Sequence, residues 1–185
     1  MRLDLKQHPT PGAPSGFSLV ESMLAIAIAS VIMGALLPRF TTIVRTFRRD
    51  GVTDQIAADV RKVRAQSIST GWQYRIIGFS SGSTNANKGQ YRMMGRSSSA
   101  IAWPADNAAQ LKTATQMAGP WVDIRTMFPG VSLNPANTAT HFSVAFDSRG
   151  VRIELDATFD PLVIQSQTGS SKSLRITPVG NVEIQ

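Results

Sequence analysis

The first part of the chain contains one long apolar run. Residues 1–16 are polar and interrupted by prolines, and the 21 residues from Phe17 to Leu37 carry Glu21 as their only charged side chain. A helix of this length extends over about 32 Å at about 1.5 Å per residue, close to the thickness of a bilayer core. The pattern therefore predicts a membrane-spanning helix over residues 17–37.

A helical repeat continues beyond the apolar run. The residues that recur at helical spacing are Ile56, Val60, Val63 and Ser67. They predict an amphipathic second half of the same helix. Pro38 lacks an N–H and Gly51 disfavours helix, so we expect bends at both positions. Gly71 is a suitable C-cap, which predicts one helix over residues 17–70.

After Gly71 the apolar positions recur with a period of two, and turn signals separate the runs. The strands expected from this pattern are 72–79, 90–94, 121–125, 131–133, 141–146, 151–155, 162–167, 173–177 and 181–184. Residues 97–120 lack a clear pattern, and we expect an exposed loop there with a short helix around residues 107–117. The helix needs a sheet to cover its apolar stripe. The sequence therefore predicts an α+β fold, with a long N-terminal helix packed on an antiparallel, β-rich head of residues 71–185.

Two simple explanations of the apolar run account for it incompletely. A cleaved secretory signal has an apolar stretch of about 7–15 residues before a small-residue cleavage site. This run is longer, and Leu36-Leu37-Pro38-Arg39 is no such site. A plain single-pass anchor remains open, but it gives Glu21 no role, although a lone acid in a membrane segment marks function by default.

The stretch Gly16-Phe17-Ser18-Leu19-Val20-Glu21 resembles the processing motif of type IV pilins and of the pseudopilins of type II secretion. The resemblance implies that a prepilin peptidase removes residues 1–16 as a leader, cutting between Gly16 and Phe17, and methylates the new N-terminus at Phe17. It also implies that Glu21 pairs with the N-terminal amine of a neighbouring subunit. Pro38 stands where many pilins carry a helix-weakening proline.

Cleavage would create a cation close to Glu21. The amine of Phe17 would lie four residues away in the same helix, and staggered subunits would bring it to a neighbour's Glu21. Such a pair would set the axial register of assembly, as one buried polar group does in a coiled coil. The alternative is an acid without a partner, whose side chain extends to the membrane surface.

Ser30 and Gly34 have the small-xxx-small spacing that lets membrane helices approach closely.

A second resemblance concerns the head. The stretch Phe146-Asp147-Ser148-Arg149-Gly150, the strand around Leu174-Arg175-Ile176 and the hairpin at Gly180 resemble the FimT/GspH branch of the pilin-like proteins. That branch comprises minor pseudopilins of type II secretion and minor type IV pilins. The resemblance implies a structural filament subunit, with the 97–120 loop as a candidate contact.

The net charge of +7 is concentrated next to the apolar run. Seven basic residues between Arg39 and Arg64 face three acids there: Arg39, Arg45, Arg48, Arg49, Arg61, Lys62 and Arg64 against Asp50, Asp54 and Asp59. The positive-inside rule would place this cluster in the cytoplasm. The pilin resemblance instead implies a single-pass protein of the bacterial inner membrane, with its head in the periplasm until it joins a filament.

Residues for catalysis are scarce. The chain has no cysteine and two histidines, His8 and His141, so we expect no disulfide, no transition-metal site and no cofactor. Asp147, Asp156 and Asp160 lack the dense spacing of a calcium loop. Nucleotide-binding and nucleophile motifs are missing as well, so the sequence favours a protein that is not an enzyme.

The sequence thus favours a minor (pseudo)pilin of a type II secretion pseudopilus or a type IV pilus. Its expected partners are prepilin peptidase, other (pseudo)pilin subunits and, before assembly, inner-membrane lipid.

The alternative is a minor pilin that binds DNA for natural transformation, because nucleic acid would attract the basic head. The candidate contacts are Arg75, Arg92, Arg96, Arg149, Arg152, Lys172 and Arg175. The acidic C-terminal stretch 180–185 lacks the Arg of the DNA-binding members, so this role is not favoured.

Overall fold

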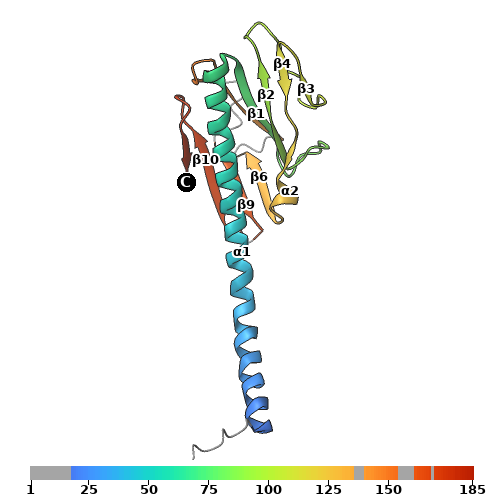
Figure 1. Ribbon diagram of the computed structural model, residues 1–185, viewed down its shortest axis with the longest axis vertical. Coiled ribbons are helices and arrows are strands. Elements are labelled where there is room, and N and C mark those ends of the chain that lie inside the picture. Colours follow the sequence, from blue (N-terminus) through green and yellow to red (C-terminus); the bar gives the residue numbers. More distant parts are fainter. Residues whose placement is uncertain (1–17, 136–139, 154–160, 168) are drawn as a thin grey trace, which may run out of the picture. The chain divides into compact units, whose positions relative to one another are not determined.

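The computed structural model describes residues 18–135, 140–153, 161–167 and 169–185. Two compact units divide the chain, Met1–Phe40 and Thr41–Gln185. The described part of the first unit is helical, and the second unit holds the rest of that helix together with the strands (Figure 1). The leader residues 1–16 and Phe17 lie outside the described residues.

Helix α1 spans Leu19–Thr70. Ser18 caps its start, because its main-chain oxygen accepts from Ser22 N at 3.1 Å and its Oγ accepts from Glu21 N at 3.4 Å. The helix is continuous through Pro38 and Gly51, so neither residue interrupts its helical structure. Gly51 instead leaves room for a neighbour, since a Cβ there would lie 2.9 Å from Phe128 Cε1.

The larger sheet has seven strands, and its pairs are antiparallel. The path β3-β4-β2-β1-β7-β8 orders six of them, and β5 pairs with β2 beside β4. Their bounds are β1 Gln73–Phe79, β2 Gln90–Arg96, β3 Leu111–Lys112, β4 Gln116–Ala118, β5 Val122–Asp123, β7 His141–Phe146 and β8 Arg152–Ile153. In the centre, β1 pairs with both β2 and β7, so that Ile76 lies opposite Met93 and Val144.

The smaller sheet has four antiparallel strands in the order β11-β10-β9-β6. They are β6 Val131–Pro135, β9 Leu162–Ser166, β10 Ser171–Ile176 and β11 Val182–Ile184. A long helix followed by an antiparallel β-sheet head confirms the predicted α+β class.

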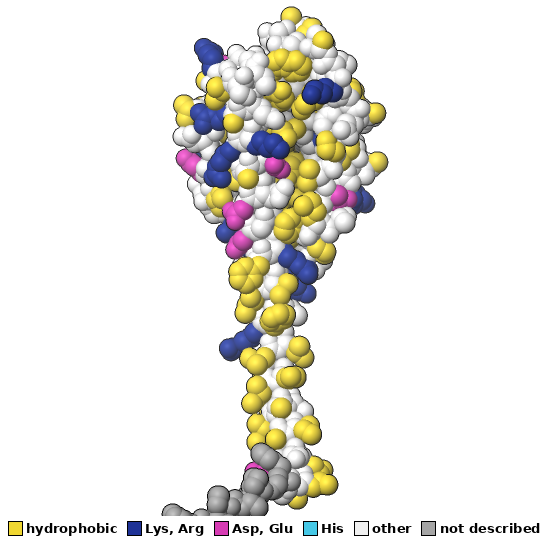
Figure 2. Space-filling view, viewed as in Figure 1, with side chains coloured by type: hydrophobic (Ala, Val, Ile, Leu, Met, Phe, Trp, Pro, Cys, Tyr) yellow, Lys and Arg dark blue, Asp and Glu magenta, His cyan; other side chains and the backbone are white. Residues whose placement is uncertain are grey.

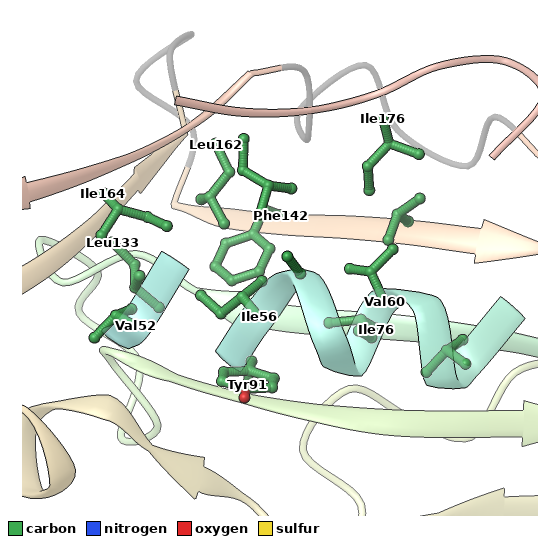
Figure 3. Close-up of a cluster of buried hydrophobic side chains, with 14 of the residues drawn as sticks. Val52, Ile56, Val60, Ile76, Tyr91, Leu133, Phe142, Leu162, Ile164 and Ile176 are labelled. Carbon is green, nitrogen blue, oxygen red and sulfur yellow. The ribbon is translucent and has the colours of Figure 1, made fainter. Parts of the chain in front are cut away.

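The core lies between α1 and the two sheets. Val52, Ile56, Val60 and Val63 of the helix are fully buried. Figure 3 shows the first three among side chains of both sheets, including Ile76 and Leu133. Burial of a Val or Ile side chain contributes about 1.5–3 kcal/mol. This stripe therefore fixes the second half of α1 to the head, as its helical repeat predicts.

Two local predictions for the head were wrong. The expected helix around residues 107–117 is the hairpin of β3 and β4, because these short strands extend the sheet from β2. The expected strand 121–125 ends after β5, and helix α2 begins at Ile124 and ends at Met127. Asp123 causes this change, since its Oδ1 accepts from the backbone N–H groups of Arg125 and Thr126. Residues 154–155 of another expected strand lie outside the described residues.

Candidate functional site

The N-terminal half of α1 is the first candidate site. From Leu19 to Leu37 the large hydrophobic residues are between 52% and 76% exposed. Hydrophobic side chains cover this part of the helix in Figure 2. Among the described residues, α1 is the one helix long and apolar enough to cross a membrane. A helix that is apolar all round is suited to lipid or to other helices.

The predicted assembly residues take distinct positions on this helix. Glu21 lies in the first turn, and its side chain is exposed. Ser30 Oγ donates to the main-chain oxygen of Ile26 at 2.8 Å, which turns the hydroxyl back onto its own helix. At Gly34 no atom other than the nearby backbone of α1 and the adjacent residues lies within 4 Å of where a Cβ would be. Neither Ser30 nor Gly34 therefore adds bulk to this face of the helix. Gly16 and Phe17 lie outside the described residues.

Sequence reasoning missed the capping role of Ser18. Ser18-x-x-Glu21 has the spacing of a capping box, in which a Ser hydroxyl accepts from the backbone N–H three residues later. The contact from Glu21 N to Ser18 Oγ has this geometry. The spacing of serine and acid therefore also defines where the helix begins, and this signal was readable in the sequence.

Two of the seven basic residues after the apolar run, Arg48 and Arg64, donate hydrogen bonds to the head. Arg48 donates to Pro129 O at 3.1 Å, and Arg49 and Lys172 lie 2.8 and 3.1 Å from Asp50. Burial alone would raise the pKa of the Asp50 carboxyl, but hydrogen bonds and charges from Arg49 and Lys172 outweigh burial and lower it. Part of the cluster thus joins α1 to the head, whereas Arg61 and Lys62 are exposed.

Three of the candidate DNA contacts lie beneath the segment 97–110. Arg92 is 1% exposed and donates to the main-chain oxygens of Ala105, Asp106 and Ala108. Arg75 donates to Asp106 Oδ1 at 2.7 Å, and Arg96 donates to Ile101 O at 3.0 Å. These guanidinium groups hold the segment on the sheet face opposite α1. Arg75 and Arg92 are buried inside the head and are not available to phosphates, whereas Arg96 is half-buried.

The same segment carries an aromatic contact to two of these arginines. The guanidinium carbons of Arg75 and Arg96 lie 4.9 and 4.5 Å from the ring centre of Trp103. Cation–π attraction of this kind contributes about 0.5–2 kcal/mol. The 97–110 segment, part of the predicted loop, is therefore held on the sheet, and its Trp103 packs on the buried cluster of Ile77, Met94 and Ala118.

A groove lies on the other face of the sheet, beside α1. It has a volume of about 740 Å³ and is bounded by α1 and by the hairpin of β3 and β4. Within it the Tyr91 hydroxyl donates to Asp59 Oδ2 at 2.6 Å. Burial, and after it the hydrogen bond and charge of Asp59, raise the pKa of Tyr91. Nothing in the sequence pattern marked this groove.

Of the three acids considered for a calcium site, Asp147 forms a turn. Asp147 Oδ1 accepts from the backbone N–H groups of Arg149 and Val151, each at 2.9 Å. Asp156 and Asp160 lie outside the described residues. Among the residues that the structure describes, no group of three His, Cys, Asp or Glu side chains could hold a metal ion.

Comparison with known proteins gives a family match for the N-terminal segment. Residues 13–37 match the family described as the prokaryotic N-terminal methylation motif. None of the curated proteins matches the chain. Among solved structures, the chain is similar to the type IV minor pilin FimU of Pseudomonas aeruginosa, with 11% identity and a TM-score of 0.43 over 74% of this chain and 87% of that chain. The chain thus combines a match to the methylation motif over residues 13–37 with a long helix whose apolar half overlaps that match and with an antiparallel β-sheet head.

Proposed function

We propose that the chain is a minor (pseudo)pilin, a structural subunit of a type II secretion pseudopilus or of a type IV pilus. The observation that carries the proposal is the methylation motif over residues 13–37, which coincides with the exposed apolar part of α1. Prepilin peptidase cuts between Gly16 and Phe17 and methylates Phe17. The protein is held in the inner membrane by α1 with its head in the periplasm until it joins the filament.

The exposed apolar surface of α1 supports this role. A soluble protein rarely exposes a contiguous apolar patch of more than a few hundred Å². Here the residues from Leu19 to Leu37 offer apolar side chains around the helix. Lipid covers them before assembly, and helices of neighbouring subunits cover them in the filament. Ser30 and Gly34 allow the close approach of those helices, and Pro38 weakens the helix where subunits must adjust to one another.

Glu21 sets the register between subunits. Its carboxylate requires a cation when lipid and other helices surround it, because an unpaired charge there is costly. The amine of Phe17 in a neighbouring subunit supplies that cation after cleavage. Staggering the helices by the distance from residue 17 to residue 21 then satisfies both charges at once.

The DNA-binding alternative receives less support. Three of the seven head cations that it would use, Arg75, Arg92 and Arg96, are engaged by the 97–110 segment. Lys172 pairs with Asp50, and Arg149 pairs with Asp147 while its side chain stays 81% exposed. A basic surface reduced in this way offers few phosphate contacts.

The proposal is tested by incorporation into filaments. In a strain that lacks the chromosomal copy, Glu21→Val and Gly16→Val should each be expressed but be missing from sheared filaments or isolated pseudopili. Asp54→Val is the matched control, because Asp54 is an exposed acid on the same helix outside the apolar run. Asp54→Val should assemble normally. Normal incorporation of Glu21→Val and Gly16→Val would refute the proposal.

The secretome of the deletion strain distinguishes the two machines. Selective loss of exported enzymes, restored by the parent chain but not by Glu21→Val, assigns the subunit to a type II secretion pseudopilus. An unchanged secretome together with lost surface motility assigns it to a type IV pilus.

A further inference from the structure

The end strands of the two sheets differ in how their outer edges are protected. An end strand directs N–H and C=O groups away from its sheet, and these groups bind a further strand unless something blocks them. The smaller sheet ends in β11 and β6, and the path through the larger sheet ends in β3 and β8. The backbone hydrogen bonds show which of these edges is available.

The outer edge of β6 is blocked by its own subunit. Leu133 O accepts from Ser81 N, and Leu133 N donates to Ser81 Oγ, both at 2.9 Å. Val131 N donates to Phe128 O at 3.3 Å, and Pro135 has no N–H group. A further strand therefore cannot pair along β6.

The end strands of the larger sheet offer little backbone for pairing. In β8 the residue that faces outward is Arg152, because Asp147 N donates to Val151 O one residue earlier. The N–H group of Arg152 donates to Pro178 O at 3.2 Å, so this edge is already used in part. β3 has two residues, as has β5 beside β4, and only one residue of each can face outward.

The ladder between β11 and β10 shows which residues of β11 face inward. Ser173 and Gln185 exchange two backbone hydrogen bonds of 2.9 Å, and Thr177 N donates to Asn181 O at 2.9 Å. In an antiparallel strand, residues that bond to one neighbour alternate with residues directed to the other side. Residues 181, 183 and 185 therefore face β10.

The two remaining residues of β11, Val182 and Ile184, direct their backbone groups outward. Within the described part of the chain, no group hydrogen bonds to the N–H or C=O of either residue. Figure 1 shows this strand, which ends at the mark C, at the margin of the smaller sheet beside β10. Two N–H and two C=O groups are thus available to a further strand.

The side chains of β11 indicate what a further strand should carry. Val182 packs on the core, and Ile184, on the same face, is 39% exposed. Glu183 is exposed on the other face and forms no ion pair with a residue that the structure describes, although Arg175 lies opposite it on β10. In an antiparallel addition Glu183 takes a non-hydrogen-bonded position, where opposite side chains come closest. Lys or Arg between two apolar residues fits this edge.

A second copy of the chain is a poor source of this strand. Two β11 strands use all their outward groups when Val182 of each bonds to Ile184 of the other. This register places Glu183 directly opposite its counterpart, and like charges in that position are destabilising. In a second copy β6 is blocked, β3 is short and β8 is partly used, as in the first. Glu183 thus disfavours self-pairing and favours a basic partner.

We propose that the outer edge of β11 binds an extended segment of a different protein by β-strand addition. The segment runs antiparallel to β11, and its backbone bonds to the N–H and C=O groups of Val182 and Ile184. A Lys or Arg of the segment lies opposite Glu183, and the apolar residues on either side of it cover Ile184. The contact involves the head alone and does not rest on the proposed pairing of Glu21.

A tethered peptide tests the proposal on the full chain in detergent. The chain has no cysteine, so Gln185→Cys gives one attachment point beside β11 for the peptide Cys-Gly-Gly-Thr-Val-Lys-Val-Thr. A short tether gives an effective concentration in the millimolar range. Hydrogen exchange of the amides of Val182 and Ile184, followed by NMR, should slow several-fold, while the amide of Glu183, which faces β10, changes little. The control peptide has Glu in place of Lys and should protect several-fold less.

Three results of this experiment would overturn the proposal. The first is unchanged exchange at Val182 and Ile184 in a folded chain that carries the lysine peptide. The second is equal protection by the lysine and glutamate peptides. The third is protection that rises with the concentration of the chain without any peptide, because it would identify a second copy as the occupant.

Proline at position 184 supplies the second arm. Ile184→Pro removes an outward N–H group but no bond to β10, so the head should stay folded by circular dichroism. Ile184→Val is the matched control, because it keeps the N–H group. With the tethered lysine peptide, Ile184→Pro should lose most of the protection of the Val182 amide, and Ile184→Val should retain it. Equal protection in the two variants would show that the peptide does not pair with the backbone of β11, and would overturn the proposal.

Discussion

Arg64 of α1 donates a hydrogen bond from Nε to the main-chain oxygen of Gly150 at 3.0 Å, in the turn between β7 and β8. Its Nη1 also donates to Asn181 Oδ1 at 3.2 Å, in the turn between β10 and β11. Gly150 has a φ of +77°, and a Cβ there would lie 2.7 Å from Ile68 Cδ1. One side chain thus joins the helix to turns of both sheets, and a glycine makes the close approach possible.

Removal of this link should destabilise the head. Arg64→Ala should lower the free energy of unfolding by about 1.5–3 kcal/mol, because charged donors form the stronger hydrogen bonds and Gly150 O loses its partner. Arg61→Ala is the control, since Arg61 is an exposed arginine one turn earlier. Denaturation of the full chain in detergent, followed by tryptophan fluorescence, measures both variants. Equal losses from Arg64→Ala and Arg61→Ala would contradict this account of the link.

The contact between Tyr91 and Asp59 should make stability depend on pH in the alkaline range. Burial and the nearby carboxylate raise the pKa of Tyr91 in the folded protein, whereas an unfolded tyrosine has a pKa of about 10. Above about pH 10 the unfolded chain releases this proton and the folded chain keeps it, so stability falls as pH rises. Tyr91→Phe removes this contribution. The difference in unfolding free energy between parent and variant should therefore shrink above about pH 10, and a constant difference would argue against it.

Gly78 should tolerate no side chain. It lies in β1, and a Cβ there would clash with the ring of Phe142, whose Cε1 would lie 2.8 Å away. Overpacking of this kind costs about 1–3 kcal/mol, so Gly78→Ala should destabilise the head by that amount. Gly82→Ala is the control, because no atom lies within 4 Å of where a Cβ would be at Gly82. Thermal unfolding of both variants by circular dichroism tests the difference.

Arg92 should hold the 97–110 segment on the sheet. Arg92→Met keeps the apolar stem of the side chain but removes three hydrogen bonds to main-chain oxygens of residues 105–108. Hydrogen exchange of the 97–110 segment should therefore speed up, while exchange in β9 and β10 stays near that of the parent. Arg125→Met is the control, because Arg125 is exposed. An unchanged segment in Arg92→Met would show that other contacts hold it.

The sequence predicted the large elements well because their patterns are long. The apolar run and the helical repeat together indicated one helix to residue 70, and α1 ends at Thr70. The strand predicted over 141–146 has the observed bounds of β7, since five of its six residues are buried. Glycines marked the end of the helix and several of the turns, and Gly71, Gly150 and Gly180 adopt positive φ.

The parts that could not be predicted depend on tertiary contacts. β3 and β4 have two and three residues, too few to show a period of two. Arginine is normally exposed, so nothing in the sequence indicated that Arg75 and Arg92 lie beneath a cover. Arg75 lies two residues from Ile77, and Arg92 lies two residues from Met94, so each pair shares one face of the sheet. Only the fold shows that residues 97–110 pack on this face. The groove is likewise visible only in the fold, because its lining comes from α1 and from strands distant in the sequence.

The mass of the mature N-terminus tests the central claim most directly. The full chain is produced with a C-terminal tag in cells with active prepilin peptidase, purified from membranes and analysed by intact-mass and N-terminal peptide mass spectrometry. A known pilin of the same cells serves as the positive control for cleavage. The account predicts a chain that begins at Phe17 with one methyl group on its amine, and a Gly16→Val variant that keeps residues 1–16. A chain that retains its leader while the control pilin is cleaved would contradict it.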